Sequence, residues 1–286
     1  MSYMFIDAKK ASHPVSRLCA ILSVSQSGYH AWKRRVMSPR RQQDQLLSSH
    51  VRVAFKRSHE SYGSPRMVHE LRDQGFAVGR RRIARLMREN GLYARKKRRF
   101  ARTTDSAHAF PIASNLLAQR FDAQRQNQKW GADITSIWTR QGWLYLAVII
   151  DLYARRVIGF EVSDRLKTDL TLAALNKAIT MRGVSPGLIH HSDRGSQYCA
   201  HAYQAKLRAN GIAISMSGKG NAYDNAMVES FFKTLKSELI WRKNFTTRTE
   251  AASAIAQYID GFYNPSRRHS ALGFISPAQF EKTGGL

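Results

Sequence analysis

The sequence predicts an α/β protein with two unlike parts, a basic helical region followed by a core built on a β-sheet. Three observations predict this class. Through the first 110 residues, apolar side chains recur every three or four positions, the period of a helix packed on one face. From Gln128 onward, runs of β-branched and aromatic residues alternate with helical segments. The charge is uneven as well, with 24 basic and 7 acidic residues up to residue 110 against 22 and 13 afterwards.

Composition indicates a nucleic acid as partner. The chain holds 46 Lys and Arg against 20 Asp and Glu, a net charge of +26. Such a field attracts a polyanion, and the release of counterions makes the binding depend on salt. A basic ribosomal or nucleoid-packaging protein is the alternative, but such chains seldom reach 43% hydrophobic and 10% aromatic residues.

Cysteine usage and hydropathy argue against several other classes. Only Cys19 and Cys199 occur, without a Cys-x-x-Cys pair, so we expect neither a disulfide framework nor a Cys/His zinc site. The longest apolar stretch, Trp143–Ile150, is too short to span a bilayer, and no signal peptide opens the chain. We therefore expect no membrane partner and a soluble, cytoplasmic protein.

The first part of the chain divides by pattern into helical segments. Apolar residues at helical spacing mark a first helix, at Val15, Leu18, Ile21 and Leu22, and a second short helix carries Tyr29 and Trp32. Along the whole chain we expect four parts: an N-terminal helical segment (1–36), a helix-turn-helix DNA-binding region (37–105), a linker (106–126), and the α/β core with its C-terminal tail (127–286).

The helix-turn-helix prediction comes from two helical stretches that begin at Ser64 and Arg80. Ser64 suits an N-cap with Pro65 behind it, and Gly75 and Gly91 suit the two helix ends. Both helices carry apolar residues on one face: Met67, Val68, Leu71, Ile83, Leu86 and Met87. The second has an arginine face: Arg81, Arg82, Arg85 and Arg88. That face is typical of a helix that enters the major groove, although a solvated helical bundle stays open as the alternative.

In the core, strand and helix signals follow one another in a definite order. Three runs read as an antiparallel meander: Trp130–Thr139, Gly142–Asp151 and Arg155–Ser163. After them we expect the helix Thr168–Arg182, the strand Leu188–His191, the helix Tyr198–Asn210, the strand Ile212–Met216, a helix that carries Glu229, and a last helix near Glu250–Tyr263. This order is that of the ribonuclease-H-like fold, in which the first and fourth strands are neighbours.

Three carboxylates occupy positions that this order would bring together. Asp133 lies in the first strand, Asp193 follows the fourth, and Glu229 lies on a helix with 35 residues between it and Asp193. Singly, each has an ordinary explanation as an exposed strand, turn or helix residue. Together they supply the hard oxygen ligands that Mg²⁺ prefers, and two such ions are typical of phosphoryl transfer. Asp151 is a nearby candidate better explained as a turn residue, and Asp224 is expected to cap the Glu229 helix.

The two aspartates and the glutamate, with this spacing, resemble the signature of retroviral-integrase-type transposases. The run from Tyr263 to Phe280 resembles the Tyr-Asn-x-x-Arg-x-His-x-x-Leu-x-x-x-x-Pro tail of the same proteins, and Lys236 matches their lysine seven residues after the glutamate. The nearest resemblance is to the downstream-frame OrfB product of frameshifting insertion elements. It implies an integrase catalytic core at 127–286 and a DNA transposase that cuts element ends and joins strands. Asp133, Asp193 and Glu229 would be the metal-holding and catalytic residues, with two Mg²⁺ ions for which Mn²⁺ substitutes.

The resemblance also implies partners. Double-stranded DNA of the element ends and target is the substrate, bound by a homo-oligomer, and an upstream-frame helix-turn-helix and leucine-zipper protein is a candidate partner. Besides the four arginines, the expected DNA contacts are Lys236, Lys233, Arg194, Lys219, Asn221 and Asn225. The basic run 95–99 is expected to contact phosphates. The rivals are a ribonuclease H or structure-specific nuclease, and a repressor that has lost catalysis. The basic N-terminal region and the tail argue against the first, and the three acids against the second.

Overall fold

The computed structural model describes residues 2–94, 112–218 and 222–284, in two compact units, Met1–His50 and Val51–Leu286. In the first unit α1 (Ser2–Lys9), α2 (Val15–Ile21) and α3 (Gln26–Arg34) enclose a small core of Ile6, Leu18, Cys19 and Tyr29. The predicted helices around Leu18 and Tyr29 are confirmed. α4 (Pro39–Arg57) crosses the boundary between the units. The expected boundaries at residues 36, 105 and 126 stay predictions.

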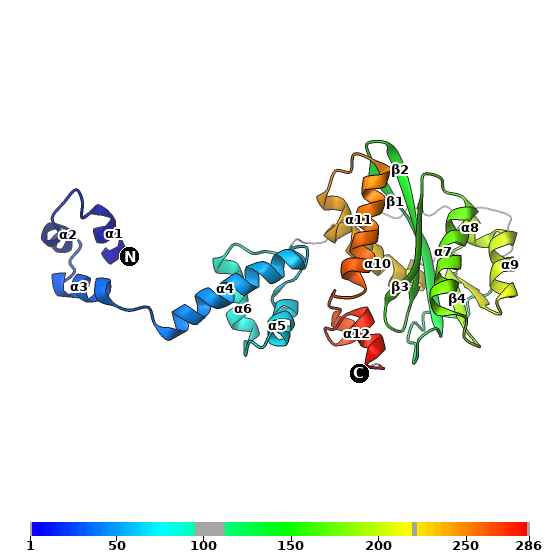
Figure 1. Cartoon of the computed structure of the whole chain (residues 1–286), viewed down its shortest axis with the longest axis horizontal. Helices are drawn as coiled ribbons and strands as arrows, with labels where there is room; N and C mark the ends of the chain where they lie inside the picture. Colours follow the sequence, from blue (N-terminus) through cyan, green and yellow to red (C-terminus); the bar gives the residue numbers. More distant parts are fainter. Residues whose placement is uncertain (1, 95–111, 219–221, 285–286) are drawn as a thin grey trace. The chain divides into compact units, whose positions relative to one another are not determined.

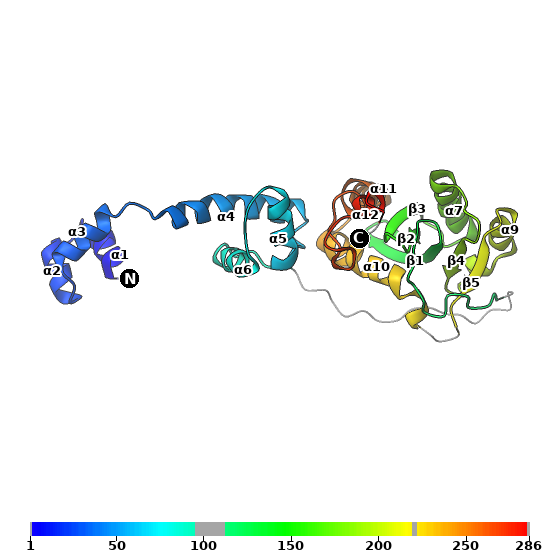
Figure 2. The same cartoon turned by 90° about the horizontal axis from the view of Figure 1, so that it is seen from below.

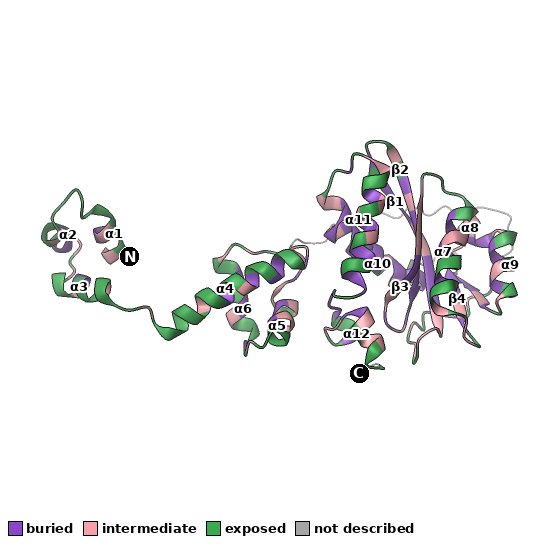
Figure 3. Cartoon of the chain, in the orientation of Figure 1, coloured by how far each residue is buried: buried purple, intermediate pink, exposed green. Residues whose placement is uncertain are grey.

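The expected pair of helices after residue 63 is present as α5 (Ser64–Asp73) and α6 (Arg80–Glu89). All six apolar residues predicted to face inward are buried (Figure 3). Gly75 and Gly91 have φ of +88° and +66°, a left-handed conformation that ends a helix and favours glycine. The expected cap at Ser64 is wrong, because Gly63 takes the N-cap position and no side chain caps the helix.

A five-stranded sheet in the order β3-β2-β1-β4-β5 forms the centre of the second unit (Figure 1). Its strands are β1 (Lys129–Thr139), β2 (Gly142–Asp151), β3 (Arg156–Ser163), β4 (Ile189–Ser192) and β5 (Ala213–Met216). β1, β2 and β3 form an antiparallel meander, while β4 runs parallel to β1 and β5 parallel to β4. This topology confirms the ribonuclease-H-like fold.

Helices cover both faces of the sheet, as Figures 1 and 2 show. α7 (Thr168–Arg182) packs on one face, and α10 (Ala226–Glu238) and α11 (Arg248–Tyr258) lie on the other. Gly159 permits the close approach of α7, because a Cβ there would stand 2.4 Å from the carbonyl oxygen of Ala174. Buried residues from the first three strands, α7, α8 (Ser196–Cys199), α9 (His201–Ala209) and the ends of β4 and β5 form a core in this layer.

Two predicted helices differ in their details. The helix expected over Tyr198–Asn210 is two helices, α8 (Ser196–Cys199) and α9 (His201–Ala209), because Ala200 adopts an extended conformation with ψ of 137°. The last predicted helix ends as an α-helix at Tyr258 and continues as a π-helical turn, Ile259–Tyr263. Short turns at Ala222–Asn225, Ile240–Arg242 and Ser270–Leu272 complete the unit. In the described ranges no helix is long and apolar enough to cross a membrane.

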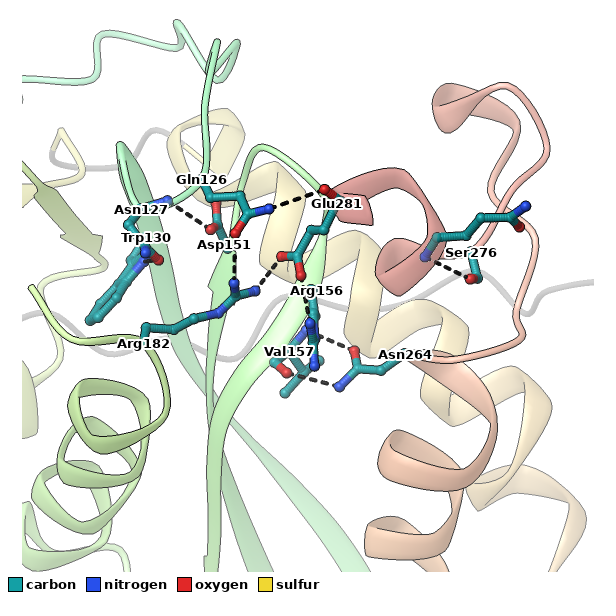
Figure 4. A network of polar contacts seen from close by, with 11 residues as sticks. Gln126, Asn127, Trp130, Asp151, Arg156, Val157, Arg182, Asn264, Ser276 and Glu281 are labelled. Carbon is teal, nitrogen blue, oxygen red and sulfur yellow. Dashed lines mark hydrogen bonds and ion pairs between the residues drawn. The ribbon is translucent and has the colours of Figure 1, made fainter. Parts of the chain in front are cut away.

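The C-terminal tail is fastened to the sheet by a polar network (Figure 4). The amide of Asn264 donates to the Val157 carbonyl at 2.9 Å and accepts from the Val157 N–H at 3.0 Å, so a side chain pairs with the edge of β3. Glu281, in α12 (Pro277–Lys282), forms ion pairs with Arg156 at 2.5 Å and with Arg182 of α7. The tail therefore closes the outer edge of the meander.

The same tail also holds the helix-turn-helix region. The guanidinium of Arg268 pairs with Glu70 at 2.8 Å and with Asp73 at 2.6 Å, both on α5. The hydroxyl of Tyr62 accepts a bond from the Arg268 backbone N–H at 2.7 Å. Arg268 is thus joined to residues 62–73 through its guanidinium and its backbone N–H. We call these contacts the Arg268 clamp.

Candidate active site

The sheet brings Asp133 and Asp193 together. β1 pairs with β4 in parallel register, with Gly131 opposite His191. Both aspartates lie two residues further along their chains, so a continuation of the register places them level with each other. Their charges interact, because Asp193 raises the pKa of Asp133. The predicted adjacency of these two acids at the sheet centre is confirmed.

The surroundings of Asp133 disfavour its negative charge. Burial raises the pKa of its carboxyl well above the usual range, and the charges of Asp193 and Glu229 raise it further. The Ile134 N–H, which donates to the carboxylate at 2.7 Å, and the cation of Lys236 act in the opposite direction. A half-buried carboxylate that is repelled by two others is a site where a bound cation lowers the electrostatic energy.

Asp193 is held by its own turn. Its Oδ1 accepts a hydrogen bond from the backbone N–H of Gly195 at 2.9 Å, which fixes the carboxylate at the end of β4. Because an Asp side chain that bonds the backbone two residues later forms a tight local turn, the Asp-Arg-Gly sequence explains the geometry. The turn leaves Asp193 half-buried beside the buried strand end.

Glu229 is positioned by close packing of α10 against β1. A Cβ on Gly131 would stand 2.8 Å from Cγ2 of Val228, so glycine in β1 lets the helix approach. At the start of α10, the Asn225 amide donates to the Ala132 carbonyl at 3.2 Å. Both contacts fasten the helix to the strand residues that precede Asp133. The carboxylate of Glu229 pairs with Lys233 at 3.3 Å, the expected i, i+4 pair.

The oxygen donors fit a hard divalent cation by their chemistry, but they do not form a closed ligand set in this conformation. Within the described ranges, no group of three or more His, Cys, Asp or Glu side chains is arranged to hold one ion. One polar atom points to a hydrated group near the acids. The hydroxyl of Tyr198 is buried without a hydrogen-bond partner in the described part of the chain, and the charges of Asp133 and Asp193 both act on it. Metal-bound water would satisfy such an atom.

The predicted DNA contacts near the acids lie in different environments. Lys233 is exposed, whereas Lys236 is only 8% exposed and interacts with Asp133, and burial lowers its pKa. Arg194 donates from Nε to the Ser217 carbonyl at 2.6 Å, and the Asn225 amide is buried in its bond to Ala132. Lys219 and Asn221 lie outside the described residues, as does the basic run 95–99. DNA contact stays a prediction for all of them.

The arginine face of α6 is present. Arg81 and Arg88 are exposed, whereas Arg82 and Arg85 are half-buried. Arg85 forms an ion pair with Glu89 at 3.0 Å, one turn further along the helix. The face therefore carries cations that water, or a phosphate backbone, can reach.

Several residues of the site were not predicted from the sequence. His191 lies between two serine hydroxyls, with Ser215 at 2.8 Å and Ser217 at 3.3 Å. Burial lowers its pKa to about 4, so the ring is neutral at pH 7. The serines come from β5 and the residue after it, and the strand register alone brings them to His191. A buried histidine next to Asp193 was visible in the sequence, but its partners were not.

Two further acids were assigned to structural roles, and one assignment needs correction. Asp151 is buried and accepts the backbone N–H groups of Asn127 at 2.9 Å and Tyr153 at 3.1 Å, which confirms the turn interpretation. Asp224 is not the cap of α10, because Asn225 takes that position. Its carboxylate instead accepts from the Gly218 N–H at 2.7 Å and the Asn115 amide at 3.0 Å.

This sheet order, with one aspartate on β1, a second directly after the adjacent β4 and a glutamate on the covering helix, defines an integrase-type α/β core. Residues 123–222 and 210–277 match families described as integrase core domains, and residues 41–100 match an HTH-like domain. The chain belongs to the family of insertion-sequence transposases. It is 43% identical, over 98% of both chains, to the transposase InsF for insertion sequence IS3A of Escherichia coli (strain K12).

A second relative agrees with the family. The chain is 46% identical to the insertion element IS600 uncharacterized 31 kDa protein of Shigella sonnei, over 93% of this chain and 97% of the relative. Among solved structures, the HTLV-2 integrase catalytic core domain in complex with magnesium (trimeric form) is similar at 17% identity and a TM-score of 0.43. That similarity covers 55% of this chain and 97% of the HTLV-2 chain.

Proposed function

We propose that this transposase cuts DNA strands at the ends of its insertion element and joins them to target DNA in a divalent-metal-dependent reaction. One observation carries the proposal. Asp133 on β1 lies level with Asp193, the residue that follows the adjacent β4, and the helix that carries Glu229 is fastened over β1 by Gly131 and Asn225. The charges of Asp193 and Glu229 both raise the pKa of the Asp133 carboxyl in this half-buried site, and such repulsion favours a bound cation.

Asp133, Asp193 and Glu229 would hold two Mg²⁺ ions, for which Mn²⁺ substitutes. When bound, such ions stabilise the charge on the attacking and leaving oxygens of an in-line displacement. The chain itself prepares the site, because Gly195 and Ile134 orient the two aspartates through their N–H groups. Glu229 pairs with Lys233 through Oε2, so its Oε1 could act as a ligand while the pair persists. Lys236 offsets part of the negative charge at Asp133.

The reaction needs no covalent protein intermediate and no ATP. In the first step a water oxygen bonds to the phosphorus, the bond to the 3′-oxygen breaks, and a free 3′-hydroxyl results. In the second step that hydroxyl bonds to a target phosphorus and displaces another 3′-oxygen. One phosphodiester replaces another, so the energy of the bond is conserved.

DNA binding is assigned to both parts of the second unit. The arginine face of α6 would contact element-end DNA in a groove, through Arg81, Arg82, Arg85 and Arg88. DNA around the acids would be contacted by a second set: Lys233, Lys236, Arg194, Lys219, Asn221 and Asn225. Assembly of several copies on DNA stays a proposal, as does cooperation with an upstream-frame protein.

Single substitutions of the acids test the proposal. Asp133→Asn, Asp193→Asn and Glu229→Gln should each abolish cleavage and joining of labelled element-end DNA in Mg²⁺, while affinity for DNA stays near that of the wild type. Affinity rests on the basic surface rather than on the ligands. Asp164→Asn, at an exposed acid between β3 and α7, is the matched control and should remain active.

The outcomes separate the rival functions. Near-normal cleavage by any of the three variants would remove that residue from the ligand set. Cleavage without joining by the wild-type chain would identify a nuclease, and specific binding without either reaction would identify a repressor.

A further inference from the structure

A cavity of about 170 Å³ lies beside α10, on a side of the helix other than the one that carries Glu229. Its polar lining includes Arg66, Arg155, Arg267, His269, Ser230 and Thr234. Because a single water needs roughly 10–15 Å³ measured in this way, the cavity has room for a larger polar group.

The lining carries excess positive charge. Arg267 is neutralised, since its guanidinium forms two hydrogen bonds of 2.8 and 2.7 Å with the buried carboxylate of Glu238. Arg66 and Arg155 have no carboxylate partner among the residues that the structure describes, and no described Asp or Glu lines the cavity. Two guanidinium groups therefore face the same space without a counter-charge.

The surroundings hold these cations in place. The guanidinium of Arg66 lies 5.8 Å from the centre of the Tyr62 ring. Burial lowers the pKa of Arg66, the nearby charge of Arg267 lowers it further, and Glu238 opposes both. Arg155 has a backbone φ of +56°, and its carbonyl accepts the Tyr263 hydroxyl at 3.2 Å, which fixes the segment that carries it. An anion would relieve the repulsion between these groups.

We propose that this cavity binds a phosphate group through Arg66 and Arg155, with the hydroxyls of Ser230 and Thr234 as additional donors. A phosphate matches the forked N–H groups of arginine, which bind two of its oxygens at once. The phosphate has two possible sources, a nucleic-acid backbone or free inorganic phosphate. Ser230 follows Glu229 directly on α10, and each DNA strand carries one phosphate for about every 3.4 Å of duplex axis, so DNA bound at the acids would bring phosphates close to the helix that lines the cavity. The DNA source rests on the proposed function, whereas the free-phosphate source does not.

The first experiment measures inorganic phosphate binding to the full chain by ³¹P NMR titration at constant ionic strength. Arg155→Gln and Arg66→Gln should each weaken binding roughly ten- to hundredfold, the range for hydrogen bonds to a charged group. Arg165→Gln removes the same charge from an exposed arginine of the core and should bind as the wild type does. Arg155→Lys, which keeps a cation, should retain more affinity than Arg155→Gln, and melting curves verify that each variant is folded.

The second experiment identifies the source with element-end duplexes in which single phosphates are replaced by neutral methylphosphonates. If the cavity binds a backbone phosphate, one position should weaken binding of the wild type and have no effect on Arg155→Gln. If only inorganic phosphate distinguishes Arg155→Gln from Arg165→Gln, the site takes free phosphate and the DNA source is rejected. If neither ligand distinguishes them, the proposal is overturned. Both readouts are binding measurements, so a failure of the catalytic proposal would be seen separately.

Discussion

Replacing His190 with glutamine should make the stability of this protein less sensitive to acid. His190 lies within β4, is completely buried, and shares a 3.0 Å hydrogen bond between its Nε2 and the Tyr203 hydroxyl. Burial, reinforced by the neighbouring His191, lowers its pKa to about 3. In the unfolded chain the same imidazole has a pKa near 6.5. Because the folded-state pKa is depressed, stability is fully present above pH 6.5 and is lost as the pH falls towards 3.

The magnitude follows from the two pKa values. At pH 5 the pH is about 1.5 units below the pKa of this histidine in the unfolded chain, and each unit is worth about 1.36 kcal/mol. Protonation of this one histidine in the unfolded chain therefore lowers the free energy of unfolding by about 2 kcal/mol. Domains of ordinary stability have a free energy of unfolding of about 5–15 kcal/mol, so a change of this size is measurable.

Urea unfolding followed by circular dichroism at pH 7 and pH 5 checks this value. From pH 7 to pH 5, the free energy of unfolding of His190→Gln should fall by about 2 kcal/mol less than that of the wild type. Its amide can still reach the Tyr203 hydroxyl, and other histidines contribute equally to both proteins. His201→Gln, at an exposed position that begins α9, is the control and should follow the wild type. An unchanged pH dependence in His190→Gln would refute the reasoning.

Two further predictions concern buried charges. Glu238→Gln leaves the buried guanidinium of Arg267 without its counter-charge and should lower the free energy of unfolding by roughly 3–5 kcal/mol. Glu161→Gln, which removes a partly exposed ion pair with Lys177, should lower it by less than about 1 kcal/mol. Equal losses in urea unfolding would contradict this prediction. Asp133→Asn removes a carboxylate whose raised pKa makes its ionised form unfavourable, so without metal it should melt higher than the wild type by calorimetry. Millimolar Mg²⁺ should raise the melting temperature of the wild type more than that of this variant, and an equal response would argue against Asp133 as a ligand.

The order of elements could be predicted because each carries a local signal. The bounds of β2 are those of its apolar run, and the i, i+4 spacing alone places Lys233 beside Glu229. The adjacency of Asp133 and Asp193 could be expected because the order of elements matches the ribonuclease-H-like fold, in which the first and fourth strands are neighbours, as β1 and β4 are here. Local periodicity and order thus determine which elements carry the acids.

What could not be predicted depends on contacts between distant residues. Asn264 pairs with Val157, 107 residues away, and Arg267 with Glu238, 29 residues away, although the sequence showed the tail only as a family motif. The break at Ala200 also has no local signal, because nothing in the residue type demands its extended ψ. Side-chain partners of this kind follow from packing, which no short window of sequence contains.

Under the proposed function, the Arg268 clamp would fix the distance between the DNA sequence that is recognised and the DNA strand that is cut. Because α5 is tied to the tail, and the tail to the edge of the sheet, α6 and the three acids belong to one body. If α6 enters a groove of element-end DNA as proposed, protein geometry would set the number of base pairs between the sequence that α6 contacts and the phosphodiester that is cut at the acids. Five inserted base pairs, about half a helical turn, would present the opposite side of the duplex to the acids.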